Sequence, residues 1–312
     1  MNGGEQRDEV SRGIRIGIVA YVVWGLLTIY WKQLSAFDAI ELIGWRVLCA
    51  TVVMAAVVTV RGRWNVLATA MRTPAVLARL TVAAILLTAN WTAYVIAVTD
   101  GRVIETALGY FMAPLGTMIL GIVVLHERPT RWQKVAIVCA AASVVVVTVS
   151  YGRPPVLALV IAVSWSVYGL LKRQIPLTAI ESLAGETFVL FVPAVAVVVA
   201  LAAGAGSIPS TADGGDWVLV AFTGLVTAVP LSLFAVAAQR VPFAILGPLQ
   251  YLVPTINFLL GWLLYDEAIP TDRLAGFALV WLALAATTFD RWRPAARPRD
   301  DVTSRYADMP AG

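Results

Sequence analysis

The chain has 312 residues, of which 60% are hydrophobic and 13% are charged, and its mean hydropathy is +0.81. A soluble domain with a polar shell does not have this composition, so the sequence predicts an integral membrane protein. The net charge of +4 comes from 23 basic and 19 acidic residues, and the basic residues are scattered through loops, which gives no indication of nucleic-acid binding.

Apolar stretches long enough to cross roughly 30 Å of hydrocarbon recur along the chain. Helices are expected for all of them, because lipid offers no hydrogen-bond partner to a free backbone N–H or C=O. The first stretch has full length and lacks a small-residue cleavage pattern, which disfavours a signal peptide. The predicted spans cover residues 14–34, 40–60, 76–98, 103–125, 132–151, 155–172, 180–203, 217–239, 243–265 and 272–290.

The charge distribution predicts the orientation. With the amino terminus inside, most of the 23 Lys and Arg residues fall on the cytoplasmic side, as the positive-inside rule requires. Residues 1–13 and 291–312 are then expected to be solvated cytoplasmic tails. We therefore expect a multi-pass protein of the plasma (inner) membrane with both termini in the cytoplasm.

The two halves of the chain resemble each other. A shift of 140 residues lays Pro114 on Pro254 and Gly121 on Gly261. The same shift lays AIE at 39–41 on AIE at 179–181, and HE at 126–127 on DE at 266–267. This pattern predicts a repeat over residues 14–151 and a second over residues 152–290.

Each predicted repeat holds five spans, and an odd number turns the second repeat upside down relative to the first. The predicted fold is therefore an all-α integral membrane protein of ten transmembrane helices, arranged as two inverted five-helix repeats. Inverted repeats suit alternating access, because exchanging the conformations of the two halves turns an outward-open state into an inward-open one.

Pro114 and Pro254 occupy equivalent positions in the fourth and ninth spans. Each removes an N–H and crowds a carbonyl one turn back, so both are candidate helix hinges. The glycines around them would allow helices to approach closely. Packing and the marking of span ends would account for the same residues, since Gly and Pro are frequent in membrane helices.

Ionisable residues inside spans cost roughly 2.5 to 3.5 kcal/mol each at the membrane centre, so they are candidate functional residues. Arg46 and its repeat mate Glu186 are the clearest, and their predicted depths are too different for a direct salt bridge. We expect Glu105 to be a better-placed partner for Arg46. Such a pair would be a buried structural contact, a cavity gate or a substrate anchor. Glu41 and Glu181 are expected to face other interfaces.

A second group of residues is aromatic or carries an amide. Such side chains could line a greasy site with a few hydrogen bonds, suited to an amphipathic or aromatic solute. Enrichment of Trp and Tyr at bilayer interfaces is the competing explanation. The candidates for substrate binding or gating in this group are Trp24, Asn90, Trp91, Tyr94, Tyr110, Tyr168, Gln250, Tyr251 and Asn257.

The sequence indicates no cofactor. Cys49 and Cys139 both lie in apolar runs, which suggests neither a disulfide framework nor a zinc site. The single histidine, His126, cannot form a multi-His metal site. Nucleotide-binding and hydrolase motifs are missing from the sequence, so ATP-driven pumping and an enzymatic function find no support.

Residues 14–290 resemble the RarD branch of EamA-type permeases in the drug/metabolite transporter superfamily. Specific segments carry the resemblance: NWTAYVIAVTDGRVIETALGYFMAPL, HERPTRWQKVAI, VSWSVYGLLKRQI, ELIGWR, and the run from VTAVPLSL to GWLLYDE. The resemblance implies ten helices in two inverted units and secondary transport, usually export, of small organic solutes. The family label mentions chloramphenicol sensitivity, which implies a candidate substrate.

Two positions depart from the family pattern. Trp45 precedes Arg46 where the family usually has a histidine, and the Pro usual after the first Trp-Gly is replaced near Thr28. Loss of the histidine removes the obvious titrating group at neutral pH. Proton coupling would then depend on Glu105 or Glu186, with a pKa raised by burial.

The leading hypothesis is a secondary transporter that exports a small amphipathic or drug-like solute. An uptake permease or exchanger is the alternative within transport. A membrane-embedded lipid enzyme and a structural or sensory membrane protein are weaker alternatives, the enzyme because Asp38, Asp100 and Asp290 are isolated near span ends. A small-molecule substrate and the lipid bilayer are the expected partners, and the sequence leaves monomer and homodimer open.

Overall fold

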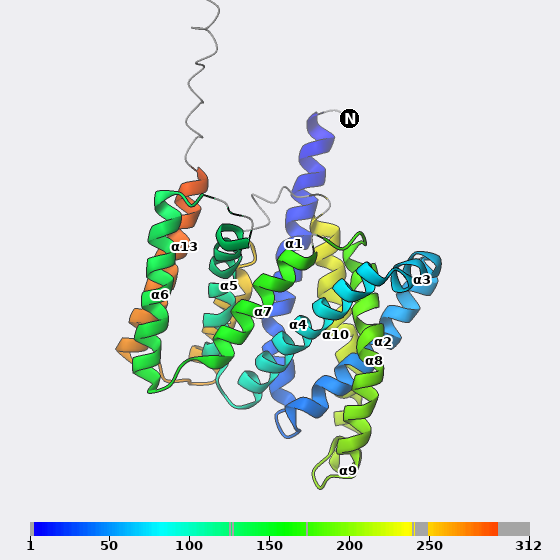
Figure 1. Cartoon of the computed structure of the whole chain (residues 1–312). Helices are drawn as coiled ribbons and strands as arrows, with labels where there is room; N and C mark the ends of the chain where they lie inside the picture. The colour runs from blue at the N-terminus through cyan, green and yellow to red at the C-terminus, as the bar shows by residue number, and fades with distance from the viewer. Residues whose placement is uncertain are drawn as a thin grey trace, which may run out of the picture.

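The computed structural model describes residues 3–124, 126, 128–172, 174–238, 240 and 249–292, and these residues form helices and short connections (Figure 1). The long helices are α1 (Gly3–Gln33), α2 (Ala39–Val60), α4 (Pro74–Thr99), α5 (Val103–Val124), α6 (Arg131–Tyr151), α7 (Val156–Lys172), α8 (Ala179–Ala202), α10 (Gly214–Ala238) and α13 (Thr271–Trp292). The shorter elements are α3 (Trp64–Arg72), α9 (Ile208–Thr211), α12 (Leu252–Leu259) and the π-helical turn η1 (Leu260–Leu264).

Each of the ten spans predicted from hydropathy overlaps a described helix, and the ninth overlaps α12 and η1 together. Among the described residues, eight helices are long and apolar enough to cross a membrane, and two apolar helices, α7 and the run Leu252–Leu264, are shorter. The prediction of an all-α membrane protein is confirmed. Of the predicted ninth span, residues 243–248 lie outside the described residues, as does most of the predicted tail 291–312.

The amino-terminal tail is helical from Gly3. Helix α1 begins at Gly3, so it includes residues 3–13, which the sequence suggested would form a solvated tail. These residues contain helix formers such as Glu5, Gln6 and Arg7, and a helix exposed to water satisfies its own backbone groups. The apolar span is therefore continued by a polar helical extension.

Two short helices, α3 and α9, follow α2 and α8 along the chain, and neither was predicted. In Figure 1, α9 lies at the bottom of the bundle, whereas the start of α1 and the end of α13 both lie at the top. A carboxylate holds each short helix. Glu41 of α2 accepts the backbone N–H of Ile208 at the start of α9, at 3.1 and 3.0 Å. Glu181 of α8 accepts a hydrogen bond from the Nε–H of Arg63, the residue before α3, at 2.5 Å.

The helix contacts have a pairwise pattern. Helix α1 packs on α10 and α12, while α7 packs on α4 and α5. Three further pairs each join a helix of the first half of the chain to a helix of the second half: α2 with α8, α6 with α13, and α5 with α12. A shift of about 140 residues along the sequence relates these contacts in pairs. It places the contact of α1 with α10 on that of α7 with α4, and the contact of α1 with α12 on that of α7 with α5. The three pairs α2 with α8, α6 with α13, and α5 with α12 are each placed on themselves.

Glycine sets the closest helix contacts. A Cβ at Gly224 of α10 would lie 2.5 Å from the carbonyl oxygen of Cys49 in α2, and a Cβ at Gly109 of α5 would lie 2.8 Å from that of Ala158 in α7. Real Cβ atoms do not reach such distances from backbone, so these helices approach closely only because glycine lacks a side chain.

The two candidate hinge prolines have different surroundings. Pro114 lies within α5, which is helical on both sides of it. Pro254 lies in the first turn of α12, where a missing N–H removes no intrahelical bond, and the irregular part of this segment is the π-turn Leu260–Leu264. The two prolines thus do not interrupt their helices in the same way.

Candidate functional site

A chain of hydrogen bonds links α1, α4, α5 and α12 inside the bundle. Thr28 Oγ1 lies 2.8 Å from the Tyr94 hydroxyl and donates to Oδ1 of Asn257 at 2.9 Å. Nδ2 of Asn257 donates in turn to Thr106 Oγ1 at 3.2 Å. A hydroxyl has a single hydrogen, and that of Thr28 is used by Asn257, so Tyr94 is the donor to Thr28. Thr28, Asn257 and Thr106 are fully buried.

A second network surrounds Asn90 of α4 and joins it to α5 and α7. Its Nδ2 donates to the carbonyl oxygen of Ile161 at 3.1 Å and lies 3.2 Å from Ser164 Oγ. Its Oδ1 accepts the hydroxyl of Tyr110 at 3.2 Å. The ring of Tyr110 is 6.0 Å from that of Tyr94, which brings the two networks together.

Aromatic rings line the same region. Trp165 of α7 packs edge-on against Trp24 at 5.8 Å and Tyr110 at 6.4 Å, and it stacks on Tyr168 at 5.7 Å between ring centroids. Such arrangements are the favoured geometries of aromatic pairs. Trp24, Tyr110 and Tyr168, which the sequence suggested as site residues, are therefore brought together by Trp165, which it did not single out.

Arg46 of α2 is buried, with 5% of its surface exposed. Its guanidinium carbon lies 3.9 Å from the ring centroid of Trp91 and 4.9 Å from that of Trp31. Its Nε donates to Thr227 Oγ1 at 3.0 Å. A charge inside a membrane costs roughly 2.5 to 3.5 kcal/mol, and each cation–π contact returns about 0.5 to 2 kcal/mol. The aromatic faces therefore offset much of the cost of burying this charge.

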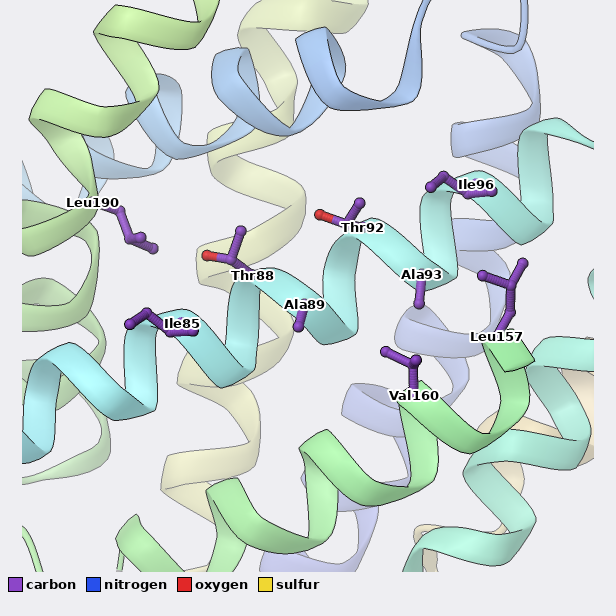
Figure 2. Close-up of a pocket in the computed structure, with 9 residues that line it drawn as sticks. All are labelled: Ile85, Thr88, Ala89, Thr92, Ala93, Ile96, Leu157, Val160 and Leu190. Atoms are coloured by element: carbon purple, nitrogen blue, oxygen red, sulfur yellow. The ribbon is translucent and has the colours of Figure 1, made fainter. Parts of the chain in front are cut away.

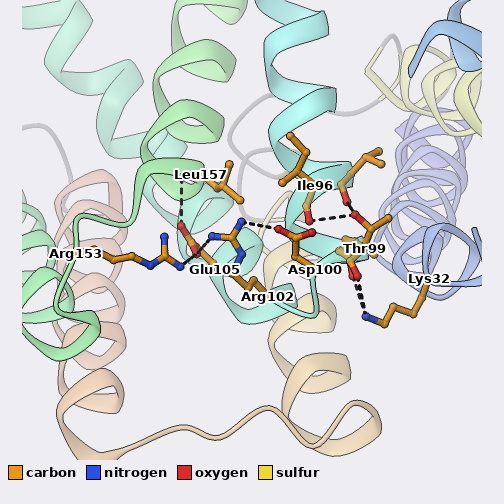
Figure 3. Close-up of polar contacts among 10 residues, drawn as sticks. Lys32, Ile96, Thr99, Asp100, Arg102, Glu105, Arg153 and Leu157 are labelled. Atoms are coloured by element: carbon orange, nitrogen blue, oxygen red, sulfur yellow. Dashed lines mark hydrogen bonds and ion pairs between the residues drawn. The ribbon is translucent and has the colours of Figure 1, made fainter. Parts of the chain in front are cut away.

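Glu105 lies elsewhere and has other partners, so the predicted Arg46–Glu105 pair is wrong. Its Oε2 lies 3.6 Å from Arg102 and 3.7 Å from Arg153, and its Oε1 accepts the backbone N–H of Leu157 at 3.2 Å (Figure 3). Hydropathy predicts where a residue lies along its span, but not the direction in which its side chain points. Glu105 instead ties the start of α5 to the start of α7.

Glu186 is fully buried and forms a compact polar cluster in the second half. Lys172 Nζ lies 2.7 Å from its Oε1, Ser182 donates to the same oxygen at 2.8 Å, and Tyr168 donates to Oε2 at 3.1 Å. Lys172 also donates to Ser182. The carboxylate of Glu186 is thus neutralised within its own half, and the ion pairs between described residues include none between Glu186 and Arg46, as expected.

Other predicted residues have structural contacts. Glu41 and Glu181 lie at interfaces with the short helices, as expected. Tyr251 packs on the hydrophobic cluster that contains Phe111 and Phe258, and Gln250 is half-buried beside residues 241–248, which lie outside the described residues.

An apolar groove of about 500 Å³ opens on the surface between α4, α7 and α8 (Figure 2). Ala89 and Ala93 of α4 and Val160 of α7 form part of its wall. These residues directly precede Asn90, Tyr94 and Ile161 in the sequence, so the groove and the polar networks lie against the same two helices.

Sequence reasoning missed Thr28, Trp31, Trp165, Lys172 and Thr227. The hydroxyl of a threonine in an apolar helix can bond to another helix, as in Thr28, or to its own helix, as Thr88 donates to the carbonyl oxygen of Ala84 at 2.8 Å. The sequence alone does not distinguish the two cases. Lys172 appeared only as a basic residue at a span end. Among the described residues, no three metal-ligating side chains come together.

Comparisons with known proteins agree with this architecture. The model of the EamA-like transporter family matches residues 11–149 and again residues 153–289. Protein RarD of Streptomyces exfoliatus is 40% identical over 292 residues, which cover 94% of this chain and 93% of that protein. The uncharacterized transporter YojE of Bacillus subtilis is 34% identical, with 94% and 99% of the two chains covered.

A more distant relative and one solved structure extend the comparison. The chloramphenicol-sensitive protein RarD of Pseudomonas aeruginosa is 26% identical over 91% of this chain and 95% of its own length. A crystal structure that is 20% identical covers 91% of this chain and 99% of the solved chain with a TM-score of 0.59, a likeness of fold. The protein belongs to the EamA-like transporter family, as a RarD-type multi-pass membrane transporter.

Proposed function

We propose that this protein is a secondary active transporter that exports a small amphipathic organic solute by alternating access. The observation that carries the proposal is the hydrogen-bond chain through Tyr94, Thr28, Asn257 and Thr106. It joins α1, α4 and α5 of the first half to α12 of the second, so any movement of the halves against each other changes it.

The helix packing supports two inverted repeats over residues 14–151 and 152–290. Helix α1 contacts α10 and α12, and its repeat mate α7 contacts the corresponding helices α4 and α5. Glu41 in the first half contacts the start of α9 in the second half, and its repeat mate Glu181 in the second half contacts Arg63 in the first half. Two halves related in this way have two equivalent arrangements, which is the requirement of alternating access.

The proposed solute site consists of the two polar networks, Arg46 and the surrounding rings. It combines large apolar faces with a few fixed donors and acceptors, the usual composition of a small-molecule site. The residues proposed to bind the solute are Trp24, Arg46, Asn90, Trp91, Tyr94, Tyr110, Tyr168 and Asn257. Glu105, Glu186, Gln250 and Tyr251 are proposed for gating. Pro114 and Pro254 are the proposed hinges.

Flux through reconstituted liposomes tests the proposal. The wild type should accumulate at least one radiolabelled solute under an imposed pH gradient, from a panel that includes chloramphenicol, after the name of the Pseudomonas relative. Asn257→Ala should lose this flux. Thr255→Ala is the matched control, because that hydroxyl is exposed and bonds only within its own helix, to Tyr251 at 2.7 Å. Equal flux in all three proteins and in empty liposomes would contradict the proposal.

Direction and coupling need separate tests. An exporter driven by proton antiport should accumulate solute in liposomes with an acidic lumen. An uptake permease driven by proton symport should accumulate it when the outside is the acidic side. Glu105→Gln and Glu186→Gln address proton coupling. Unchanged dependence of flux on pH in both variants would remove these two carboxylates as proton carriers.

A further inference from the structure

We propose that the solute bound by this protein carries a carboxylate, and that Arg46 is the residue that binds it. The inference rests on the proposed function, because it names the chemical class of solute for the same site. Three observations on Arg46 lead to it: the missing counter-charge, the free donors of its guanidinium, and the groups around it.

Arg46 has no acidic partner among the described residues. Every ion pair between described residues involves Arg63, Arg102, Arg153 or Lys172, and none involves Arg46. Cation–π contacts stabilise a cation without cancelling its charge. An uncompensated guanidinium inside a membrane protein favours the entry of an anion.

The second half of the chain shows what a compensated charge looks like here. Glu186 is the repeat mate of Arg46, and Lys172 neutralises it at 2.7 Å. The mate of Lys172 is Lys32, which donates to the carbonyl oxygens of Val98 and Thr99 at 3.1 and 3.5 Å. The fold therefore neutralises one of the two pseudo-equivalent charges and leaves the other without a partner.

The donors of Arg46 that suit a carboxylate are the unused ones. Among the described residues the guanidinium donates only through Nε, to Thr227. Its two terminal amino groups thus have no hydrogen-bond partner among the described residues. Three side-chain atoms of the described residues are fully buried and lack a hydrogen-bond partner: Glu105 Oε2, Ser150 Oγ and Arg273 Nε. The terminal amino groups of Arg46 are not among them. Two parallel N–H groups match the two oxygens of a carboxylate.

The surroundings favour an organic acid over a small inorganic anion. The rings of Trp91 and Trp31 flank the guanidinium, and Tyr30, Tyr94 and Tyr110 lie within electrostatic range of it. Apolar rings next to a charged head match a molecule with a carboxylate at one end and a planar or apolar body behind it. Chloramphenicol has no carboxylate, so it is expected to be a weaker ligand than such an acid.

A pair of probes that differ only in charge tests this inference. We would measure thermal unfolding of the purified full-length protein with 3-phenylpropionate or with 3-phenylpropanamide, over a range of concentrations of each. The acid should stabilise the wild type, with an apparent dissociation constant at least tenfold lower than that of the amide. Arg46→Gln should bind both probes alike, and Arg46→Lys should retain part of the preference because it keeps the charge and loses the paired donors.

Arg72→Gln is the control, since it removes an exposed arginine at the end of α3. It should leave the preference for the acid unchanged. Equal stabilisation by acid and amide, no stabilisation by the acid, or a preference that survives Arg46→Gln would each overturn the inference. If Arg46→Gln does not fold, the comparison of acid with amide in the wild type and in Arg46→Lys decides the question.

Failure of this inference can be told apart from failure of the proposed function. Flux of radiolabelled 3-phenylpropionate through liposomes that is equal in the wild type and in Arg46→Gln, and absent from empty liposomes, would leave a transporter standing and overturn the role of Arg46. Lack of flux for any solute, together with acid binding that depends on Arg46, would keep the site and contradict transport.

Discussion

Lys172 at the end of α7 and Glu186 in α8 form an ion pair of 2.7 Å in which the carboxylate is fully buried. Removing one member of such a pair leaves an uncompensated charge. We expect Lys172→Met to lower the free energy of unfolding in detergent by about 3 kcal/mol. Adding Glu186→Gln to this variant should restore part of the loss, because it removes the charge that was left unpaired.

Lys134→Met is the control for this pair, because Lys134 is exposed near the start of α6. It should change the free energy of unfolding by less than about 0.5 kcal/mol. Additive effects of Lys172→Met and Glu186→Gln in the double variant would show that the two residues do not interact.

Glu267 holds the start of α5 from the other half of the chain. Its carboxylate accepts the backbone N–H groups of Val103 and Ile104 at 2.5 and 2.9 Å. This contact caps α5 and places a negative charge at its amino-terminal end. We expect Glu267→Ala to lower the free energy of unfolding by about 1 to 2 kcal/mol, measured by denaturant titration in detergent.

Glu267 also predicts a dependence of stability on pH. Burial raises the pKa of its carboxyl above the ordinary value of 4.5. The folded state then binds the proton more tightly than the unfolded state, so the contribution of this group falls as pH rises from 4.5 to the raised pKa. Glu267→Gln should remove this slope. A slope of the same size in the variant would assign it to other groups.

Close helix approach can be tested with a matched pair of glycines. Gly109→Ala should lower the free energy of unfolding by about 1 to 3 kcal/mol, because its Cβ would meet the backbone of α7. Gly169 lies on an exposed face of α7, and a Cβ added there by Gly169→Ala would have no atom within 4 Å. That change should be neutral or stabilising by up to about 1 kcal/mol. Equal effects would argue against close packing of α5 on α7.

The proposed orientation predicts the labelling of the two short helices. In a chain without Cys49 and Cys139, a cysteine at Thr211 in α9 should react with an impermeant maleimide added to intact cells. A cysteine at Asn65 in α3 should react only after the cells are opened. Both positions are exposed, so the reversed result would place both termini outside.

The sequence predicted the helices well because burial in lipid imposes a length and an apolar composition on each span. It predicted the partners of the polar residues poorly. Arg46 and Glu105 were predicted to pair and have other partners, because the rotation of each helix about its axis depends on packing. Asn90, Tyr94, Tyr110 and Asn257 were chosen for their chemistry, and the structure brings them together.

Thr28 shows the limit most clearly. It was noticed only as a departure from the family pattern, yet its hydroxyl connects Tyr94 to Asn257. The partners are separated from it by 66 and 229 positions in the sequence, so no local pattern marks them. Long-range contacts of this kind arise only when helices from both halves pack together.

Through Glu41 and Glu181, each half of the protein forms hydrogen bonds to a short helix of the other half, or to the residue before it. Glu41 in α2 binds the start of α9, and Glu181 in α8 binds the residue before α3. Because of these crossed contacts, a change in the angle between α2 and α8 is transmitted to both short helices at once. Spectroscopic labels on α3 and α9 would therefore report one motion as two correlated signals, each from a different end of the bundle.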